Sequence, residues 1–429
     1  MLKNILFFSK QKKVNVFFAF FLGIILYNFI VVKNFSVFKV DCITYTYHIV
    51  DFSIGLCSKL LPGAIFSFLF KEVMPWHVTL VETVLLFISF AVISFFITEL
   101  IFRQENKENQ KTIILFSLFF ITGPVTFSIF TQELGILDVY WLYFSLFFFF
   151  VISKKYLYFL IPVIYILSVS IHFSSVISYI LLFSIIILYR IAKEKNERTL
   201  LIFVLIFSVA AAAALTVFFM KNESENLNYD LEGFHNFIDS RCKMEDEQYY
   251  IYYDYSLYKV PYTKDFPYES MDKALLIQNS RIIPDFLCGI INSFWQQILI
   301  VLYAYRQIPK NIINLIHLLT LIFPAFLFFN RFWLNKIHEA GKTDKFMAFS
   351  YFLMLIQLPF TALIGCLCSP DFVRWFAHAF LIQFAFVFYV IFSDGEGSVK
   401  WIANYFSKYN NKILFLYFAV YSITTFPTY

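Results

Sequence analysis

Asp51 and Lys59 stand eight residues apart in a short polar stretch between two strongly apolar segments. A carboxylate can act as a general base toward a hydroxyl, and a lysine ammonium can bind phosphate oxygens. The stretch ends at Pro62 and Gly63, which break the chain before a further apolar run. Asp51 could instead cap the short helix that follows it, and Lys59 could snorkel toward lipid headgroups. The spacing favours the floor of an active site outside the membrane, beside these structural alternatives.

Other ionisable residues stand at the ends of apolar runs elsewhere in the chain, namely Asp41, Glu133, Asp138, His172, Asp371 and Arg374. Ionisable groups near membrane depth are costly, so they are candidates for functional residues. Each also has a structural alternative. Glu133 and Asp138 could be solvated loop residues, and His172 could be a core histidine with satisfied hydrogen bonds. Asp371 and Arg374 could pair with each other on one helical turn.

Together these residue types suit the transfer of a sugar from a phosphorylated lipid, because carboxylates activate a hydroxyl and cations neutralise a phosphate leaving group. We assign the catalytic role to Asp51, Glu133 and Asp138, with Asp51 as the base. We assign substrate or phosphate binding to Lys59, His172, Asp371 and Arg374. A divalent metal is compatible with this chemistry, although no residue spacing specifies a metal site, and the cofactor stays open.

The elements that must position these residues are membrane helices. The chain has 429 residues, of which 60% are hydrophobic and 15% charged, against about 25% charged residues in ordinary soluble proteins. Many apolar runs reach the roughly 20 residues that cross a bilayer. Backbone groups in lipid must be satisfied within the segment, and the runs are continuous and do not alternate. We expect an all-α, polytopic helix bundle, and nothing in the composition points to a nucleic-acid partner.

The apolar runs predict about eleven spans, at about 14–32, 78–102, 112–131, 139–153, 156–171, 173–191, 199–220, 312–329, 346–368, 375–393 and 412–427. The lysines before the first span predict a cytoplasmic N-terminus. That span lacks a small-residue cleavage site, so we interpret it as a retained helix. Ala64–Phe70 is too short to cross and predicts an interfacial or re-entrant piece. The bias toward Phe, Ile, Lys and Asn suggests a bacterial source, hence the inner membrane.

Residues 286–305 are apolar enough to cross the membrane but carry several amides. If this segment crosses, three basic residues of the C-terminal third lie inside and seven lie outside; if it does not cross, these numbers reverse. The positive-inside rule therefore favours an interfacial or re-entrant segment. Under that choice Arg374 lies at the same face as Asp51 and Asp138.

The chain divides into an N-terminal bundle at 1–220, a polar segment at 221–285 and a C-terminal membrane part at 286–429. The polar segment carries thirteen Asp or Glu, seven Lys or Arg and a run of tyrosines, which predicts an extracytoplasmic cap, with a mobile linker as the alternative. The six cysteines show no zinc spacing. Cys242 could pair with Cys288 or Cys42 in an oxidising compartment.

The span pattern resembles bacterial polytopic glycosyltransferases of the GT-C architecture and the related envelope polysaccharide polymerases of the O-antigen type. The resemblance is carried by the first external loop with Asp51 and Lys59, the Glu133–Asp138 loop, His172 and the sequence Asp-Phe-Val-Arg-Trp at 371–375. In GT-C enzymes an acidic residue of the first external loop commonly serves as the base. The resemblance implies that role for Asp41 or Asp51.

The expected function is a glycosyltransferase or polymerase of cell-envelope polysaccharide assembly. It would take a polyprenyl-linked sugar and transfer it to a glycan acceptor at the extracytoplasmic face. The alternative is a transporter or flippase of a lipid-linked glycan or a small solute, which predicts charges through the depth of the bundle and internal repeats. A scaffold for an envelope complex is a third interpretation, and the oligomeric state stays open.

Overall fold

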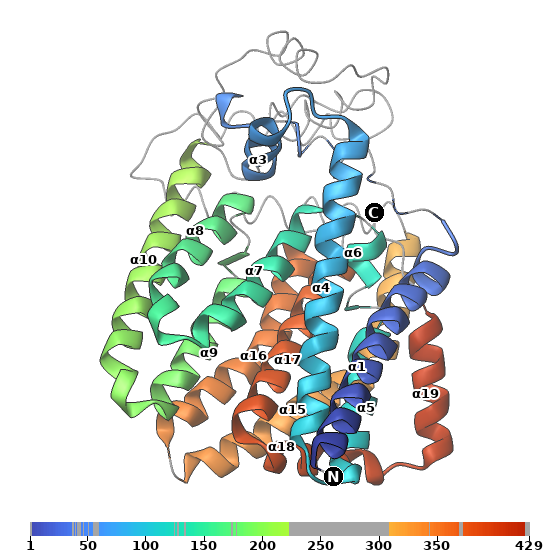
Figure 1. The fold of residues 1–429 in the computed structure, drawn as a ribbon. Helices are drawn as coiled ribbons and strands as arrows, with labels where there is room; N and C mark the ends of the chain where they lie inside the picture. The colour runs from blue at the N-terminus through green and yellow to red at the C-terminus, as the bar shows by residue number, and fades with distance from the viewer. Residues whose placement is uncertain are drawn as a thin grey trace.

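The computed structural model describes residues 2–222 and 309–424, apart from 37, 39, 41–43, 46, 50, 55–59, 124, 127, 133, 173, 174, 177, 343 and 369–371. These residues form helices and turns and contain no strand, which confirms the all-helical class (Figure 1). The predicted cap at 221–285, beyond the last turn of its preceding helix, and the segment 286–305 lie outside the described residues.

The N-terminal half contains α1 (Leu2–Tyr27), η1 (Asn28–Val32), η2 (Phe52–Ile54), α3 (Leu61–Leu69), α4 (Pro75–Arg103), α5 (Lys107–Ile121), α6 (Ser128–Gln132), α7 (Leu137–Ile152), η3 (Lys155–Leu160), α8 (Ile161–Ile171), α9 (Tyr179–Lys193), η5 (Lys195–Glu197) and α10 (Arg198–Asn222). The C-terminal part contains α15 (Pro309–Gly341), α16 (Lys345–Cys368), α17 (Phe372–Asp394), α18 (Glu396–Ser407) and α19 (Asn411–Ile423).

Six of the described helices are long and apolar enough to cross a membrane, and they correspond to α1 with η1, α4, η5 with α10, α15, α16 and α17. Three shorter apolar helices run over Leu137–Ile152, Lys155–Ile171 and Lys412–Ile423. These helices are consistent with a membrane protein. Six of the eleven predicted spans are thus matched by helices of full membrane length, and the larger number stays a proposal.

The third predicted span, 112–131, is not one continuous helix. α5 ends at Ile121, a turn follows, and α6 begins at Ser128. The turn contains Gly123, where a Cβ would lie 2.8 Å from the Tyr421 hydroxyl, so close packing of α19 requires a glycine there. The Tyr27 hydroxyl lies 2.8 Å from the carbonyl oxygens of Thr122 and Ser422 and can donate its one proton to either, which joins α1, α5 and α19 at this turn.

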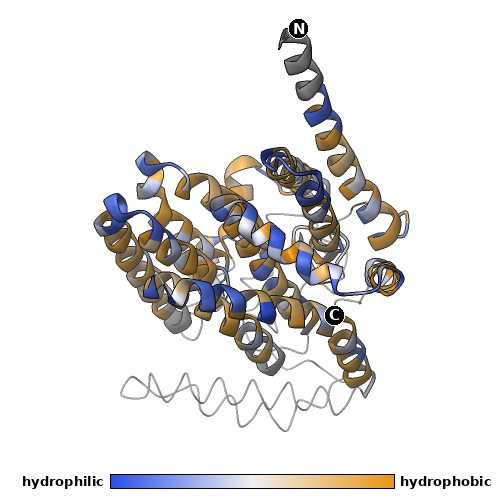
Figure 2. Ribbon diagram, turned by 90° about the horizontal axis from the view of Figure 1, so that it is seen from below, coloured by the Kyte–Doolittle hydropathy of each residue, from blue (hydrophilic) through white to orange (hydrophobic). Residues whose placement is uncertain are grey.

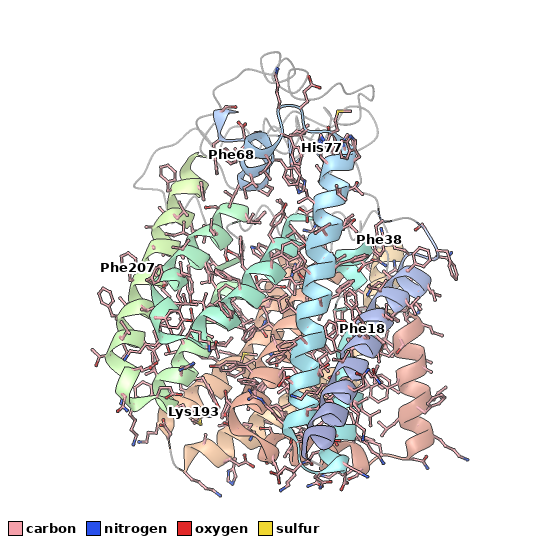
Figure 3. The ribbon with its side chains drawn as sticks, viewed as in Figure 1. Phe18, Phe38, Phe68, His77, Lys193 and Phe207 are labelled. Carbon is pink, nitrogen blue, oxygen red and sulfur yellow. The ribbon has the colours of Figure 1, made fainter. Side chains whose placement is uncertain are left out.

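The bundle has two ends, which we name by residues that mark them. The basic end is the one at which Lys13 pairs with Glu99 at 3.0 Å and Lys193 pairs with Asp394 at 3.6 Å. Figure 3 labels Lys193 at this end and His77 at the opposite one, which we call the His77 end. Figure 2 looks onto the basic end and shows hydrophilic turns between apolar helices.

α17 lies at the centre of the bundle. Its most apolar window is 83% buried, against 11% for the first span, so it contacts protein on nearly all sides. α17 packs against α16 and α9, and α16 packs against α15. Gln383 on α17 accepts from the Trp333 indole at 2.5 Å and donates to Gln357 at 2.7 Å and to the carbonyl of Met354 at 2.9 Å. Hydrogen bonds of this kind hold helices together where hydrophobic burial cannot drive association.

Candidate active site

A buried ion pair joins the first turns of α7 and α17 at the His77 end. Asp138 lies in the first turn of α7 and Arg374 in that of α17. The Arg374 guanidinium donates to Asp138 Oδ2 from Nε at 2.8 Å and from Nη2 at 2.6 Å. The Asp138 side chain is 8% exposed and that of Arg374 is 31% exposed. The carboxylate is therefore buried, whereas part of the guanidinium reaches the surface of the protein.

His378 extends this ion pair by one helical turn. Its Nε2 lies 3.0 Å from Asp138 Oδ2, and its Nδ1 lies 3.0 Å from the Tyr179 hydroxyl at the start of α9. In the neutral imidazole, Nε2–H would donate to the carboxylate and Nδ1 would accept from the tyrosine, an assignment made from the partners alone. The cluster thus unites α7, α9 and α17. Arg374 and His378 face the same carboxylate because residues four apart share one face of a helix.

Aromatic rings surround the imidazole of His378. The ring centroids of Trp141 and Tyr179 lie 5.3 and 5.5 Å from it, and the ring of Trp375 lies at 6.2 Å. The Trp141 indole in turn donates to the Ser168 carbonyl at 3.2 Å. Such packing fixes the orientation of the imidazole, as a proton-transferring group requires. Aromatic faces also suit the faces of sugar rings.

The position of Asp138 explains how a carboxylate can be buried there. It lies near the N-terminus of α7, and it is bound to a residue near the N-terminus of α17. Helix N-termini carry partial positive charge and favour an anion, whereas they disfavour a cation such as Arg374. The negative charge of the carboxylate therefore compensates the positive charge of the guanidinium and the partial positive charges at the N-termini of α7 and α17. Removal of Arg374 would leave the buried carboxylate uncompensated, which costs about 3–5 kcal/mol.

The two oxygens of Asp138 are used unequally. Arg374 and His378 both contact Oδ2. Within the described part of the chain, Oδ1 has no hydrogen-bond partner. One oxygen thus holds the cluster together while the other could accept a proton from a hydroxyl group.

A second buried cluster is centred on Glu82 of α4, which is fully buried. The Tyr140 hydroxyl lies 2.5 Å from Glu82 Oε1, and the Tyr143 hydroxyl lies 3.4 Å from Oε2. His48 Nε2 lies 2.9 Å from the Tyr140 hydroxyl and 3.4 Å from Glu82 Oε1. Its Nδ1 lies 2.7 Å from the Thr44 carbonyl. The two clusters share α7, since Asp138 and Tyr140 lie on its first two turns.

The hydrogen bonds of this second cluster restrict where its protons can be. His48 Nδ1 must donate, because its partner is a carbonyl oxygen. Tyr140 has one proton for two neighbours, Glu82 and His48 Nε2. One hydroxyl proton cannot serve both contacts, so both are hydrogen bonds only when a further proton is on Glu82 or on His48 Nε2.

Gly135 makes the turn that leads into α7 and brings the two clusters together. Its φ is +77°, which glycine adopts without strain. A Cβ at this position would lie 3.0 Å from Glu82 Cγ, 3.1 Å from Thr44 Cγ2 and 3.4 Å from His48 Cε1. The backbone thus approaches the second cluster so closely that only glycine fits without displacement.

Two of the other residues assigned from the sequence are described by the structure. Asp51 is buried, and its Oδ1 accepts from the backbone N–H of Ser53 at 2.9 Å. This is the capping arrangement that the sequence allowed as an alternative. His172 ends α8, and its ring lies 6.3 Å from that of Trp141. The structure thus places His172 beside the aromatic wall of the Asp138 cluster.

The remaining assigned residues are Lys59, Glu133 and Asp371, and all three lie outside the described residues, as does Asp41. Arg374 does pair with an acidic residue, but the partner that the structure shows is Asp138. Sequence reasoning did not single out His378, Tyr179, His48 or Glu82 as site residues. The spacing of His378 four residues after Arg374 is the signal that could have found it.

Metal binding has no candidate within the described part of the chain, where no group of three or more His, Cys, Asp or Glu side chains could hold an ion. Comparison with known proteins adds no relative, since no family model, curated protein or solved structure matches the chain. Function must therefore be inferred from the two clusters and their surroundings.

Proposed function

We propose that this protein is an integral-membrane glycosyltransferase or polysaccharide polymerase that uses a polyprenyl-linked sugar donor at the His77 end. The observation that supports it is the buried Asp138–Arg374–His378 cluster, which three helices assemble. Ionisable groups at such depth are functional candidates by default. A carboxylate, a guanidinium and an imidazole are also the groups that acid–base chemistry beside a phosphate requires.

In this proposal the acceptor hydroxyl attacks the anomeric carbon of the donor sugar. Its proton passes to Asp138 Oδ1, and the bond between the anomeric carbon and the phosphate oxygen breaks. The polyprenyl phosphate or diphosphate leaves with both electrons of that bond, and the Arg374 guanidinium neutralises its charge. His378 holds Oδ2, so it positions the base. The sequence favoured Asp51 as the base; because that carboxylate caps a turn, we now prefer Asp138.

The topology that we propose has the basic end in the cytoplasm, with the N-terminus on that side and about eleven spans. It is supported by the concentration of Lys and Arg near the basic end, as the positive-inside bias predicts. The bacterial inner membrane is the proposed location. Lys59, Glu133, His172 and Asp371 stay proposals for contacts with the sugar or phosphate.

The test is replacement of the gene by variants in its source organism, with analysis of envelope glycan and of polyprenyl-linked precursors. Asp138→Asn should lower glycan at least tenfold and cause precursor to accumulate, since loss of a general base typically costs 10²–10⁴-fold. Membrane levels of each variant are measured in parallel. The double variant Asp138→Asn/Arg374→Gln removes both charges, so it separates stability from chemistry. Normal glycan in this double variant would refute the proposed roles.

The second candidate function is proton-coupled transport of a lipid-linked glycan or a small solute. It is favoured by the buried Glu82–Tyr140–His48 cluster, in which a carboxyl, a hydroxyl and an imidazole lie within hydrogen-bonding distance of one another inside the bundle. Purified protein in vesicles distinguishes the two. Acidification of the interior that depends on an added solute, and that is lost in Glu82→Gln, would favour transport over transfer.

A further inference from the structure

A cavity of about 810 Å³ lies among α4, α7, α9 and α17, on the basic-end side of the Asp138 cluster. This volume is within the range of about 300–1,000 Å³ for sites that enclose a small ligand. Its walls are largely apolar, with Phe96, Leu146 and Phe388 among them. Tyr179, which binds His378 of the candidate active site, lies at its inner limit.

The cavity opens to the side of the bundle. Val92 and Phe95 on α4 and Phe150 on α7 line it, and all three side chains are exposed on the outer surface. α4 and α7 approach each other near Glu82, where Tyr140 and Tyr143 contact it. The opening therefore lies between the same two helices, nearer the basic end, on a surface that lipid would cover.

The cavity is as long as a lipid chain requires. Along α9 its lining extends from Tyr179 to Lys193, which is about 21 Å at the rise of an α-helix. The hydrocarbon core of a bilayer is about 30 Å thick. A chain that enters at the basic end and reaches Tyr179 would thus extend past the middle of the membrane.

The mouth of the cavity at the basic end is lined by Arg103, Arg190 and Lys193. The Arg103 guanidinium carbon lies 3.8 Å from the centroid of the Phe392 ring, and the described residues provide no carboxylate partner for it. The Nε–H of Arg190 is buried and has no acceptor within the described part of the chain. Buried N–H groups without a protein acceptor are rare, and most of them donate a hydrogen bond to a water molecule or a ligand.

Carboxylates also lie near this mouth and are already paired. Glu99 binds Lys13 at 3.0 Å, and Glu194 and Glu197 each lie 3.7 Å from Arg190 Nη2. Lys193 pairs with Asp394 at 3.6 Å. Arg103 and the Nε–H of Arg190 are therefore the donors that an incoming anion could use.

We propose that the cavity binds an anionic glycerophospholipid of the leaflet at the basic end. Its phosphate lies between Arg103 and the Nε–H of Arg190, and one acyl chain follows α17 toward Tyr179. The glycosyl donor is a different lipid, because its phosphate belongs beside Arg374 at the opposite end. The inference does not depend on the transferase reaction, and its test measures binding alone.

The experiment is a native mass-spectrometry titration of the purified full-length chain with phosphatidylglycerol. Arg103→Gln removes the charged donor, and Ala385→Phe fills the cavity from α17. Each should raise the dissociation constant about tenfold, the change expected on loss of one charge-assisted hydrogen bond or of equivalent contact. Lys155→Gln is the matched control, since this lysine begins η3 near the same end and does not line the cavity. It should leave binding unchanged.

Two lipids complete the test. Phosphatidylcholine should bind at least tenfold more weakly than phosphatidylglycerol. Undecaprenyl phosphate should not displace bound phosphatidylglycerol at equal concentration. Unchanged binding in both Arg103→Gln and Ala385→Phe would refute the site. Displacement by undecaprenyl phosphate that is lost in Arg103→Gln would identify the occupant as a carrier lipid and overturn our choice. Thermal unfolding without added lipid reports whether each variant is folded.

Discussion

Asp138 and Arg374 are 236 residues apart in the chain and share two hydrogen bonds, at 2.8 and 2.6 Å. The contact fixes the start of α7 against the start of α17. It also joins the N-terminal and C-terminal halves of the bundle at the His77 end. The consequence for stability is direct, because the buried carboxylate depends on this guanidinium for compensation of its charge.

Arg374→Gln should destabilise the protein by about 3–5 kcal/mol, because it leaves the buried Asp138 carboxylate without its cation. Asp138→Asn should cost less, because the Arg374 guanidinium is 31% exposed and water can solvate it in part. The double variant should be more stable than either single variant. Chemical unfolding of purified protein in micelles measures the three changes. If the effects of the two single variants simply add in the double variant, the pair is not coupled and the contact contributes nothing specific.

Tyr179→Phe should test whether the hydrogen bond from Tyr179 orients His378, because the variant leaves the imidazole itself unchanged. The variant removes one hydrogen bond to Nδ1, at a cost of about 1 kcal/mol, and keeps the aromatic wall. In the enzyme proposed here it should lower kcat more than it raises KM, since the positioned groups act in the transition state. His378→Gln, which can still donate to Asp138, is the companion variant. Unchanged kcat in both would exclude His378 as a positioning residue.

Tyr140→Phe should destabilise the protein more than Tyr143→Phe. Both tyrosines lie on α7 and face the same carboxylate, but the Tyr140 hydroxyl lies 2.5 Å from Glu82 and the Tyr143 hydroxyl lies 3.4 Å away. Tyr140 also bridges to His48, so its loss leaves two buried groups unsatisfied, at about 1–3 kcal/mol each. Thermal unfolding of the pair measures the difference. Equal effects would mean that Tyr140 does not mediate between Glu82 and His48.

Gly135→Ala should be more damaging than Gly395→Ala, although both glycines have positive φ, at +77° and +69°. The strain of positive φ costs each variant about 1 kcal/mol or more. At Gly135 the new Cβ would in addition lie 3.0 Å from Glu82, whereas at Gly395 no atom lies within 4 Å. Unfolding experiments compare the two. Equal losses would show that the Glu82 cluster moves aside without cost.

Much of this architecture could be predicted from the sequence, because lipid imposes a simple rule on the backbone. The apolar runs that begin near 78, 199, 346 and 375 correspond to α4, α10, α16 and α17. The prediction was least accurate where the chain turns inside an apolar run. The single predicted span at 112–131 is divided into α5 and α6 at Gly123-Pro124, a local turn signal that a prediction from hydropathy alone passes over.

The site could be predicted only in part. The topological argument placed Asp138 and Arg374 at one face, and the structure brings them into contact. It could not give the rotation of each helix about its axis, which decides that His378 also faces Asp138. Glu82 and His48 meet through long-range packing between α4 and the segment before it. Such pairings depend on the whole bundle, so spacing along the chain does not reveal them.

Among the described helices that are apolar and long enough to span a membrane, α17 is the most buried within the bundle, and this has a consequence for biogenesis. It carries Arg374, His378 and Gln383, which insert poorly into a bilayer when a helix is alone. Their partners come from α7, α9, α15 and α16. All four of these helices are synthesised before α17. We therefore expect α17 to insert into the membrane late, against helices that are already in place. Deletion of these earlier helices should prevent α17 from inserting into the bilayer.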